Sequence, residues 1–248
     1  VFYPPFLPHI NVRVNYRNHR KITVIDGTKA FIGGLNLGDE YTGKSARYGF
    51  WRDTHFLIEG SAVDFLQLRF ITDWEFAAKT NLPFHDKYFP QKEITGTAGI
   101  QTAYFVPDDS LAEALKTAAL GGVDVKIMIP GKRDHPFVHW ASTSYLSDLL
   151  DSGVKAYIYN YDRFLHTKAV MVDGRIASVG SANFDIRSFS YNFEVNAVVY
   201  DPYTVSRLEQ QFREDMRQCI GLTRELYDRR SVNVRFRESV SRLISPLL

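Results

Sequence analysis

Two stretches of the sequence carry the same set of residues that can perform chemistry. Residues 18–36 read NHRKITVIDGTKAFIGGLN, and residues 165–183 read LHTKAVMVDGRIASVGSAN. At a single offset of 147 residues, without a gap, seven positions are identical. The identical pairs are His19 and His166, Lys21 and Lys168, Asp26 and Asp173, Gly27 and Gly174, Ala30 and Ala177, Gly33 and Gly180, and Asn36 and Asn183. We interpret them as a duplicated site.

Each copy offers an imidazole, an ammonium group and an amide. If the two copies face each other, one pocket holds two histidines, two lysines and two asparagines. Lysine and asparagine can donate hydrogen bonds to the non-bridging oxygens of a phosphoryl group. One histidine can attack phosphorus, and the other can protonate the departing alkoxide. This set favours phosphodiester transfer without a metal ion or other cofactor, because the two ammonium groups supply the positive charge.

Short strands are expected to position these groups. The runs ITVID and AVMVD are β-branched and apolar and stop at Asp-Gly, which predicts a strand that ends in a turn. AFIGG and ASVGS predict the following strand, with small residues where the backbone approaches a neighbour closely. Histidine and lysine stand two apart on the first strand, so we expect them on one face. Asp26 and Asp173 end their strands and receive a structural role.

The pattern HxKxxxxDxxxxxxGG/GSxN resembles the signature of the phospholipase D superfamily in both copies. The surrounding segments are similar to bacterial cardiolipin synthases. They read INVRVNYRNHRKITVIDG, FIGGLNLGDEY, GFWRDTH, DHPFVHWAS and GSANFDIRSFSYNFEVNAVVYD. The superfamily implies a covalent phosphohistidine. This branch implies transfer of a phosphatidyl group between two phosphatidylglycerol molecules, which gives cardiolipin and glycerol. Following the habit of the superfamily, we assign the attack to His19 and the proton transfers to His166, although a near-symmetric pair does not distinguish them.

Two acidic residues are candidates to orient the histidines. Asp53 and Glu194 each open a strand expected beside its own motif. A carboxylate on one imidazole nitrogen fixes the tautomer and leaves the other nitrogen free to react. Residues so placed often have this role in the superfamily. The alternative is an ordinary acid at the end of a strand.

Four further residues are candidates to contact the lipid head group. They follow predicted strands, whose carboxyl ends commonly line the ligand crevice of α/β folds. The four residues are Tyr104, Asp108, Lys132 and His135. Charged loop residues without a role are the equal alternative. His135 and His139 stand four apart, but no third ligand lies nearby, so packing or substrate contact is preferred to a metal site.

Strands and helices alternate along the chain, which predicts an α/β fold. The resemblance implies two phospholipase D-type α-β-α sandwich halves with mixed sheets and an active site at their pseudo-twofold interface. Pro, Gly, Thr and charges in residues 80–98 place the boundary between halves 1–93 and 94–248. A helix over 61–79 is expected to bury Val63, Leu66, Phe70 and Trp74. Relatives carry another strand and helix near residues 91–100, so both halves are expected to be incomplete.

Composition limits the remaining functions. With a net charge of +2, the 248 residues show no strong bias toward nucleic acid, and no nucleic-acid partner is expected. Cys219 is the one cysteine and cannot indicate a redox compartment. No run of 18 apolar residues occurs in the sequence. Relatives usually carry two membrane-spanning helices ahead of this point, so we expect a fragment whose parent protein is anchored in the bacterial cytoplasmic membrane.

The C-terminal stretch RFRESVSRLISPLL predicts an amphipathic helix. Phe236, Val240, Leu243, Ile244 and Leu247 fall on one face, with arginines elsewhere. This helix could lie on an anionic membrane surface, or its apolar face could dock on the body of the protein. The pattern favours neither reading.

A hydrolase of the same superfamily is the main alternative function. Phospholipase D and nucleases use the same phosphohistidine, and a nuclease would bind DNA with a steep salt dependence. The resemblance around DIRSFSYNFEVN favours the synthase. An inactive lipid-binding fragment or scaffold is a third reading, although both motifs are intact.

Overall fold

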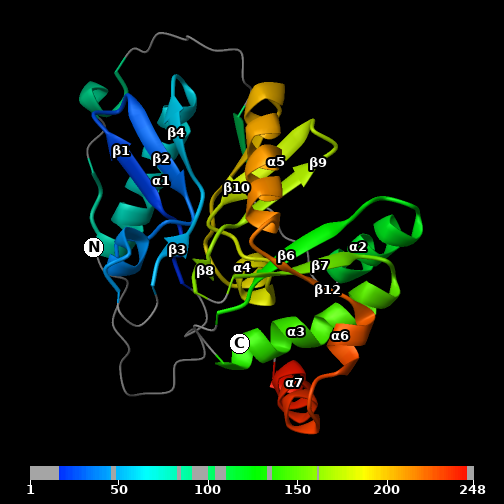
Figure 1. The fold of residues 1–248 in the computed structure, drawn as a ribbon. Coiled ribbons are helices and arrows are strands. Elements are labelled where there is room, and N and C mark those ends of the chain that lie inside the picture. The colour runs from blue at the N-terminus through cyan, green and yellow to red at the C-terminus, as the bar shows by residue number, and fades with distance from the viewer. Residues whose placement is uncertain are drawn as a thin grey trace, which may run out of the picture. The chain divides into compact units, whose positions relative to one another are not determined.

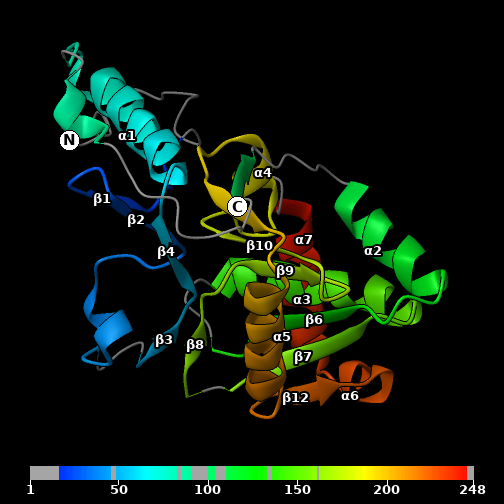
Figure 2. The same cartoon turned by 90° about the horizontal axis from the view of Figure 1, so that it is seen from above.

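The computed structural model describes residues 17–45, 49–82, 85–90, 100–103, 110–132, 136–160 and 162–244. The fold is mixed α/β, as predicted (Figures 1 and 2). The chain divides into two compact units. Unit 1 comprises Val1–Asn36, Asp53–Phe105 and Thr167–Glu209, and unit 2 comprises Leu37–Arg52, Val106–His166 and Gln210–Leu248. These units are defined by the compactness of the fold. The boundary expected near residue 93 divides the two halves of the repeat instead, and it stays a prediction.

Unit 1 contains two antiparallel sheets. The first has the order β1-β2-β4, with β1 at Ile22–Ile25, β2 at Lys29–Gly33 and β4 at His55–Glu59. The second has the order β5-β11-β10-β9, with β5 at Ile100–Ala103, β11 at Asn196–Val199, β10 at Ile176–Gly180 and β9 at Ala169–Val172. The helices of this unit are α1 at Ala62–Ala78, α4 at Ile186–Ser190 and the single turn Asp86–Tyr88.

The duplicated stretches fold alike. Ile22 lies opposite Ile32 in β1 and β2, and the corresponding Ala169 lies opposite Val179 in β9 and β10. The linking turns both have positive φ at Asp-Gly, with 50° and 65° at Asp26 and Gly27 and 53° and 64° at Asp173 and Gly174. Two successive left-handed residues define a type I′ turn, which matches the twist of the strands that it joins. The predicted strands and turns are therefore confirmed, and the structural role of the two aspartates stays a prediction.

Apolar residues of α1, the first sheet and β11 form a core cluster in unit 1. Its fully buried side chains are Ala30, Ile32, Ile58, Val63, Leu66 and Ala197. The alternation in β2 sends Ala30 and Ile32 to the face that α1 covers. The prediction for Phe70 is wrong, because its side chain is 42% exposed. The buried stripe of α1 therefore lies mainly at its N-terminal turns.

Unit 2 contains a sheet of order β12-β7-β6, with β12 at Ile220–Leu222, β7 at Lys155–Tyr159 and β6 at Lys126–Pro130. A two-stranded parallel sheet joins β3 at Trp51–Arg52 with β8 at Phe164–Leu165. The helices are α2 at Ser110–Leu120, α3 at Pro136–Asp151, α6 at Arg224–Asp228, α7 at Val232–Ile244 and the single turn Asp39–Thr42. Helix α5 at Pro202–Met216 runs from unit 1 into unit 2.

The core of unit 2 lies between α3 and its sheet. Strands β6 and β7 are parallel, and α3 forms the crossover between them. Leu146 and Leu149 of α3 pack with Val154, Ile158 and the α6 residue Tyr227. In the part of the chain that the structure describes, no helix has the length and apolar character needed to span a membrane.

Candidate active site

The chain enters the first motif beside the segment that leads into β11. The amide of Phe193 donates to the carbonyl of Arg17 at 2.8 Å, and the amide of His19 donates to the carbonyl of Phe193 at 2.9 Å. His19 and Lys21 lie just before β1, and His166 and Lys168 just before β9, so the prediction that these residues belong to the strands is wrong. The backbone of each histidine is instead held by a hydrogen bond from its amide, to the carbonyl of Phe193 for His19 and to that of Arg52 for His166.

Glu194 holds the imidazole of His19. Its carboxylate oxygens lie 2.9 and 3.0 Å from Nδ1, and the glutamate side chain is only 8% exposed. Ser181 donates to the same carboxylate at 2.5 Å, and Asn192 donates to it at 3.2 Å. Because a carboxylate accepts hydrogen bonds, this arrangement places a proton on Nδ1 and leaves the lone pair of Nε2 available for attack.

The two motif lysines share one electrostatic environment within unit 1. Burial lowers the pKa of Lys168 to about 7, with Asp53 acting in the opposite direction and Lys21 lowering it further. Burial also lowers the pKa of Lys21 to about 8, against the attraction of Glu194 and Asp53. The ammonium of Lys21 donates to the carbonyl of His19 at 2.7 Å. A negatively charged phosphoryl group would favour the protonated form of both lysines.

Arg20 anchors the segment that carries the nucleophile candidate, and the sequence reasoning did not single it out. Its guanidinium donates to both carboxylate oxygens of Asp73 at 2.5 and 2.6 Å and to the carbonyl of Glu194 at 3.2 Å. The side chain is almost fully buried and lies over the ring of Phe193 at 4.9 Å. The one available signal was an arginine between two motif residues, which is weak by itself.

The difference between GG and GS in the two motifs has a physical explanation. A Cβ added to Gly34 would lie 2.5 and 2.6 Å from the carboxylate oxygens of Asp53. The equivalent residue of the second copy is Ser181, which instead donates a hydrogen bond to Glu194. One copy therefore leaves space for a carboxylate, and the other copy binds one.

His166 lies in unit 2 and has an aromatic environment. The hydroxyl of Tyr41 lies 3.0 Å from its Nδ1, and the ring centroid of Trp51 lies 4.9 Å from that of His166. The ring of Phe164 lies 6.0 Å away. Tyr41 was missed as a site residue, although it belongs to the word FIGGLNLGDEY that carries the family resemblance.

The backbone around the two histidines follows the same pattern. The amide of His166 donates to the carbonyl of Arg52 at 2.7 Å, as the amide of His19 donates to that of Phe193. Asp53 follows Arg52 along the chain as Glu194 follows Phe193. Asp53 therefore has the sequence position, relative to this hydrogen bond, that Glu194 has in the other copy.

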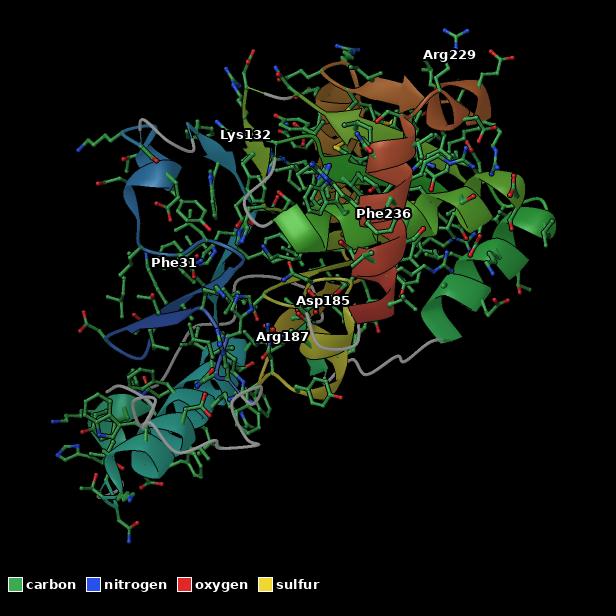
Figure 3. The ribbon with its side chains drawn as sticks, turned by 90° about the horizontal axis from the view of Figure 1, so that it is seen from below. Phe31, Lys132, Asp185, Arg187, Arg229 and Phe236 are labelled. Atoms are coloured by element: carbon green, nitrogen blue, oxygen red, sulfur yellow. The ribbon has the colours of Figure 1, made fainter. Side chains whose placement is uncertain are left out.

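The other predicted residues are placed to different extents. Asn36 and Asn183 are half-buried and follow β2 and β10, and their contact with phosphoryl oxygens stays a prediction. Lys132 follows β6 with its ammonium near Gly49, where an added Cβ would lie 3.4 Å from it (Figure 3). Tyr104, Asp108 and His135 lie outside the described residues. Within the described ranges, no group of three or more His, Cys, Asp and Glu side chains could hold a metal ion.

Comparison with known proteins defines the class. The family described as "Cardiolipin synthase, PLD-like domain" matches residues 92–216, and the chain belongs to this family. The crystal structure of phosphatidylserine synthase from Haemophilus influenzae has the same fold. It has a TM-score of 0.64 at 14% sequence identity and covers 93% of this chain and 71% of its own.

Curated relatives narrow the resemblance. The chain is 47% identical over 280 aligned positions to cardiolipin synthase 2 of Staphylococcus epidermidis, with 100% of this chain and 57% of the relative covered. It is 46% identical over 270 positions to cardiolipin synthase of Oceanobacillus iheyensis, with 96% of this chain and 56% of the relative covered. The chain thus spans a little over half the length of these relatives. The first alignment is longer than the 248 residues of this chain, so that relative has residues inside the aligned range that this chain lacks.

Proposed function

We propose that this chain carries the catalytic residues of a cardiolipin synthase-type phosphatidyltransferase, which converts two phosphatidylglycerol molecules to cardiolipin and glycerol. The observation that carries the proposal is the imidazole of His19, whose Nδ1 is bound by the buried carboxylate of Glu194. Two lysines with pKa values of about 8 and 7 accompany it in unit 1. The curated relatives with this name support the choice of reaction.

In the first half of the reaction, Nε2 of His19 attacks the phosphorus of one phosphatidylglycerol. The bond between phosphorus and the glycerol head-group oxygen breaks, and His166 gives its proton to the departing alkoxide. The product is glycerol, and the phosphatidyl group remains on His19. Glu194 stabilises the positive charge that develops on the attacked imidazole, as a buried carboxylate does in other histidine-dependent sites.

In the second half, a second phosphatidylglycerol supplies the acceptor. His166, now neutral, takes the proton from a hydroxyl of its glycerol head group. The oxygen attacks the phosphohistidine, the bond between phosphorus and Nε2 breaks, and cardiolipin forms. The proton balance closes, because His166 ends the cycle in its starting protonation state.

Lys21 and Lys168 stabilise the phosphoryl oxygens in both halves, with Asn36 and Asn183 as further donors. Approach of the anionic phosphodiester offsets the burial of the two ammonium groups and favours their protonated forms. The substrates are membrane lipids, so we place the reaction at the surface of the bacterial cytoplasmic membrane.

The test is to incubate the chain with phosphatidylglycerol vesicles, without added metal, and to follow the lipids by mass spectrometry. Cardiolipin and glycerol, lost in His19→Ala and in His166→Ala, are the expected products. Phosphatidic acid without cardiolipin would show that the chain is a phospholipase and not a synthase. No product from a folded chain would overturn the assignment of turnover to this region.

Quenching with a denaturant at neutral pH after a brief incubation tests the separate roles of the histidines, because acid would hydrolyse the bond between phosphorus and the imidazole nitrogen. With radiolabelled lipid, the His166→Ala variant should retain label on the protein, and the His19→Ala variant should not. The reverse result would make His166 the nucleophile. Glu59→Gln, on an exposed carboxylate of β4, is the matched control and should behave as the wild type.

A further inference from the structure

Helix α7 packs on unit 2 with its polar side. Glu238 and Ser241 are 5% and 0% exposed, and Glu238 accepts hydrogen bonds from Arg230 and from Thr143 of α3. Phe236 and Leu243 are 69% and 82% exposed, and Val232 and Val240 are also exposed. The reading in which the apolar face docks on the body of the protein is therefore wrong for these described residues.

The exposed apolar residues form one stripe. Successive helical residues are about 100° apart, so Val232, Phe236, Val240 and Leu243 fall within an arc of about 80°. In the view of Figure 3, α7 (red) lies on the near side of its unit, with Phe236 on it, and Arg229 projects away from the ribbon. We refer to Val232, Phe236, Val240 and Leu243 as the α7 stripe.

Arginines border the α7 stripe. Residues 224–244 contain six arginines against three acidic residues and no lysine. Arg235 and Arg242 fall on one side of the stripe, and Arg237 falls on the other, above the ring of Trp140 at 5.2 Å. Among the described residues, the guanidinium groups of Arg229 and Arg235 have no hydrogen-bond or ion-pair partner. Arg242 is paired with Asp148, so Arg235 and Arg237 supply the net positive charge of the border.

A cleft of about 190 Å³ opens beside the stripe between α3, α6 and α7. Its lining includes four arginines, two acidic residues and three serines, namely Arg224, Arg230, Arg235, Arg242, Asp228, Glu238, Ser144, Ser147 and Ser239. Carboxylates already bind Arg224, Arg230 and Arg242. Arg235 is the cation in this lining that keeps its donors for a ligand, so the cleft can accept one anionic phosphate at the level of lipid head groups.

We propose that the α7 stripe is the surface through which this chain binds an anionic phospholipid bilayer. Apolar side chains enter the acyl boundary, and the bordering arginines meet lipid phosphates, as in amphipathic helices that lie in the membrane interface. The charge of the border selects a bilayer over an apolar protein surface. The inference depends on the geometry of unit 2 and not on the proposed reaction.

A local fluorescence probe tests this proposal in the full chain. Cys219→Ser removes the native thiol, and Phe236→Cys then carries an NBD label. Vesicles of phosphatidylcholine with phosphatidylglycerol should shift the NBD emission to the blue, and vesicles of phosphatidylcholine alone should shift it far less. The matched control is Phe76→Cys, on α1, whose phenylalanine is 67% exposed. It should show no shift.

Flotation with the same vesicles supplies the affinity. Phe236→Ser and Leu243→Ser should each weaken binding about tenfold, the effect of losing burial of one large apolar side chain. Arg235→Gln should weaken it mainly at low salt. Wild-type affinity in both serine variants would overturn the proposal. A blue shift that grows with protein concentration in the absence of vesicles would overturn it too, in favour of a second copy of the chain.

Discussion

Nδ1 of His19 lies 2.9 Å from the carboxylate of Glu194, although His19 belongs to the first copy of the repeat and Glu194 follows the second. The backbone bridge between Asn18 and Phe193 brings the copies together inside unit 1. Duplication therefore supplies more than a second set of groups. The second half of the chain contributes the carboxylate that fixes the tautomer of His19, which we propose as the nucleophile.

Replacement of this carboxylate should impair the attack on phosphorus. In Glu194→Gln, an amide N–H can face Nδ1 and favour the tautomer whose Nε2 carries the proton. We expect kcat to fall about 10²- to 10⁴-fold, as when the orienting carboxylate of a catalytic triad becomes an amide. Rapid-quench measurement of protein-bound label checks this, because formation of the phosphohistidine itself should slow.

Ser181→Ala tests the support that the Glu194 carboxylate receives from its neighbours. The serine hydroxyl donates to the carboxylate and accepts a hydrogen bond from the buried amide of Val195 at 3.0 Å. We expect a loss of roughly tenfold, since removal of a group that orients an active-site residue typically has such an effect. A loss in Ser181→Ala equal to that in Glu194→Gln would show that the carboxylate acts only through local structure.

Tyr41 should matter for proton transfer and not for attack. Its hydroxyl lies 3.0 Å from Nδ1 of His166, where it holds the ring with Nε2 directed away. In Tyr41→Phe, we expect about tenfold slower release of glycerol. The p-nitrophenolate group of a p-nitrophenyl phosphodiester departs without a proton, so its release should be nearly unchanged. Equal losses with both leaving groups would contradict a role in proton transfer.

The repeat could be predicted in detail from the sequence. Seven identities at one offset correctly indicated two strand pairs joined by Asp-Gly turns, because such turns have a local sequence requirement. The burial of Val63 and Leu66 also followed from helical spacing. These features depend on neighbours along the chain, which periodicity and turn chemistry describe.

Features that depend on distant segments could not be predicted in this way. The pairing of His19 with Glu194 joins residues 175 apart, and that of Tyr41 with His166 joins residues 125 apart. The helical pattern of α7 identified its apolar face but not which face docks. That outcome depends on the polar partners of Glu238, which lie in α3 and in the turn before α7.

The pH dependence should follow the two lysines. In the proposed reaction both act as cations, and their pKa values are about 8 for Lys21 and about 7 for Lys168. The protonated fraction falls as pH rises, so kcat/KM for phosphatidylglycerol should fall as pH rises through 7 to 8. In Lys168→Arg, position 168 stays charged throughout this range, and the decline should begin nearer pH 8. An unchanged profile would exclude Lys168 as its origin.

The same burial should make Lys168 unfavourable for folding. Its pKa is lower in the folded chain than in the unfolded chain, so between about pH 7 and 10.5 the unfolded state binds more protons. The destabilisation is therefore fully present below pH 7 and fades as pH rises. Lys168→Met should raise the free energy of unfolding at pH 7 by roughly 1–3 kcal/mol while abolishing turnover. Urea titration at pH 6 and pH 9 should show a larger gain at pH 6.

Gly34 should tolerate no side chain, because the Asp53 carboxylate occupies the place of a Cβ. An alanine at this position would put Cβ 2.5 Å from Oδ1 of Asp53, closer than real contacts allow. The carboxylate must shift, and we expect Gly34→Ala to lower the free energy of unfolding by about 1–3 kcal/mol and to reduce turnover. The matched control is Gly221→Ala in β12, where the nearest atom would lie 4.0 Å away and stability should change little. Equal stability of both variants would mean that Asp53 can leave Gly34 freely and that the carboxylate is not held there.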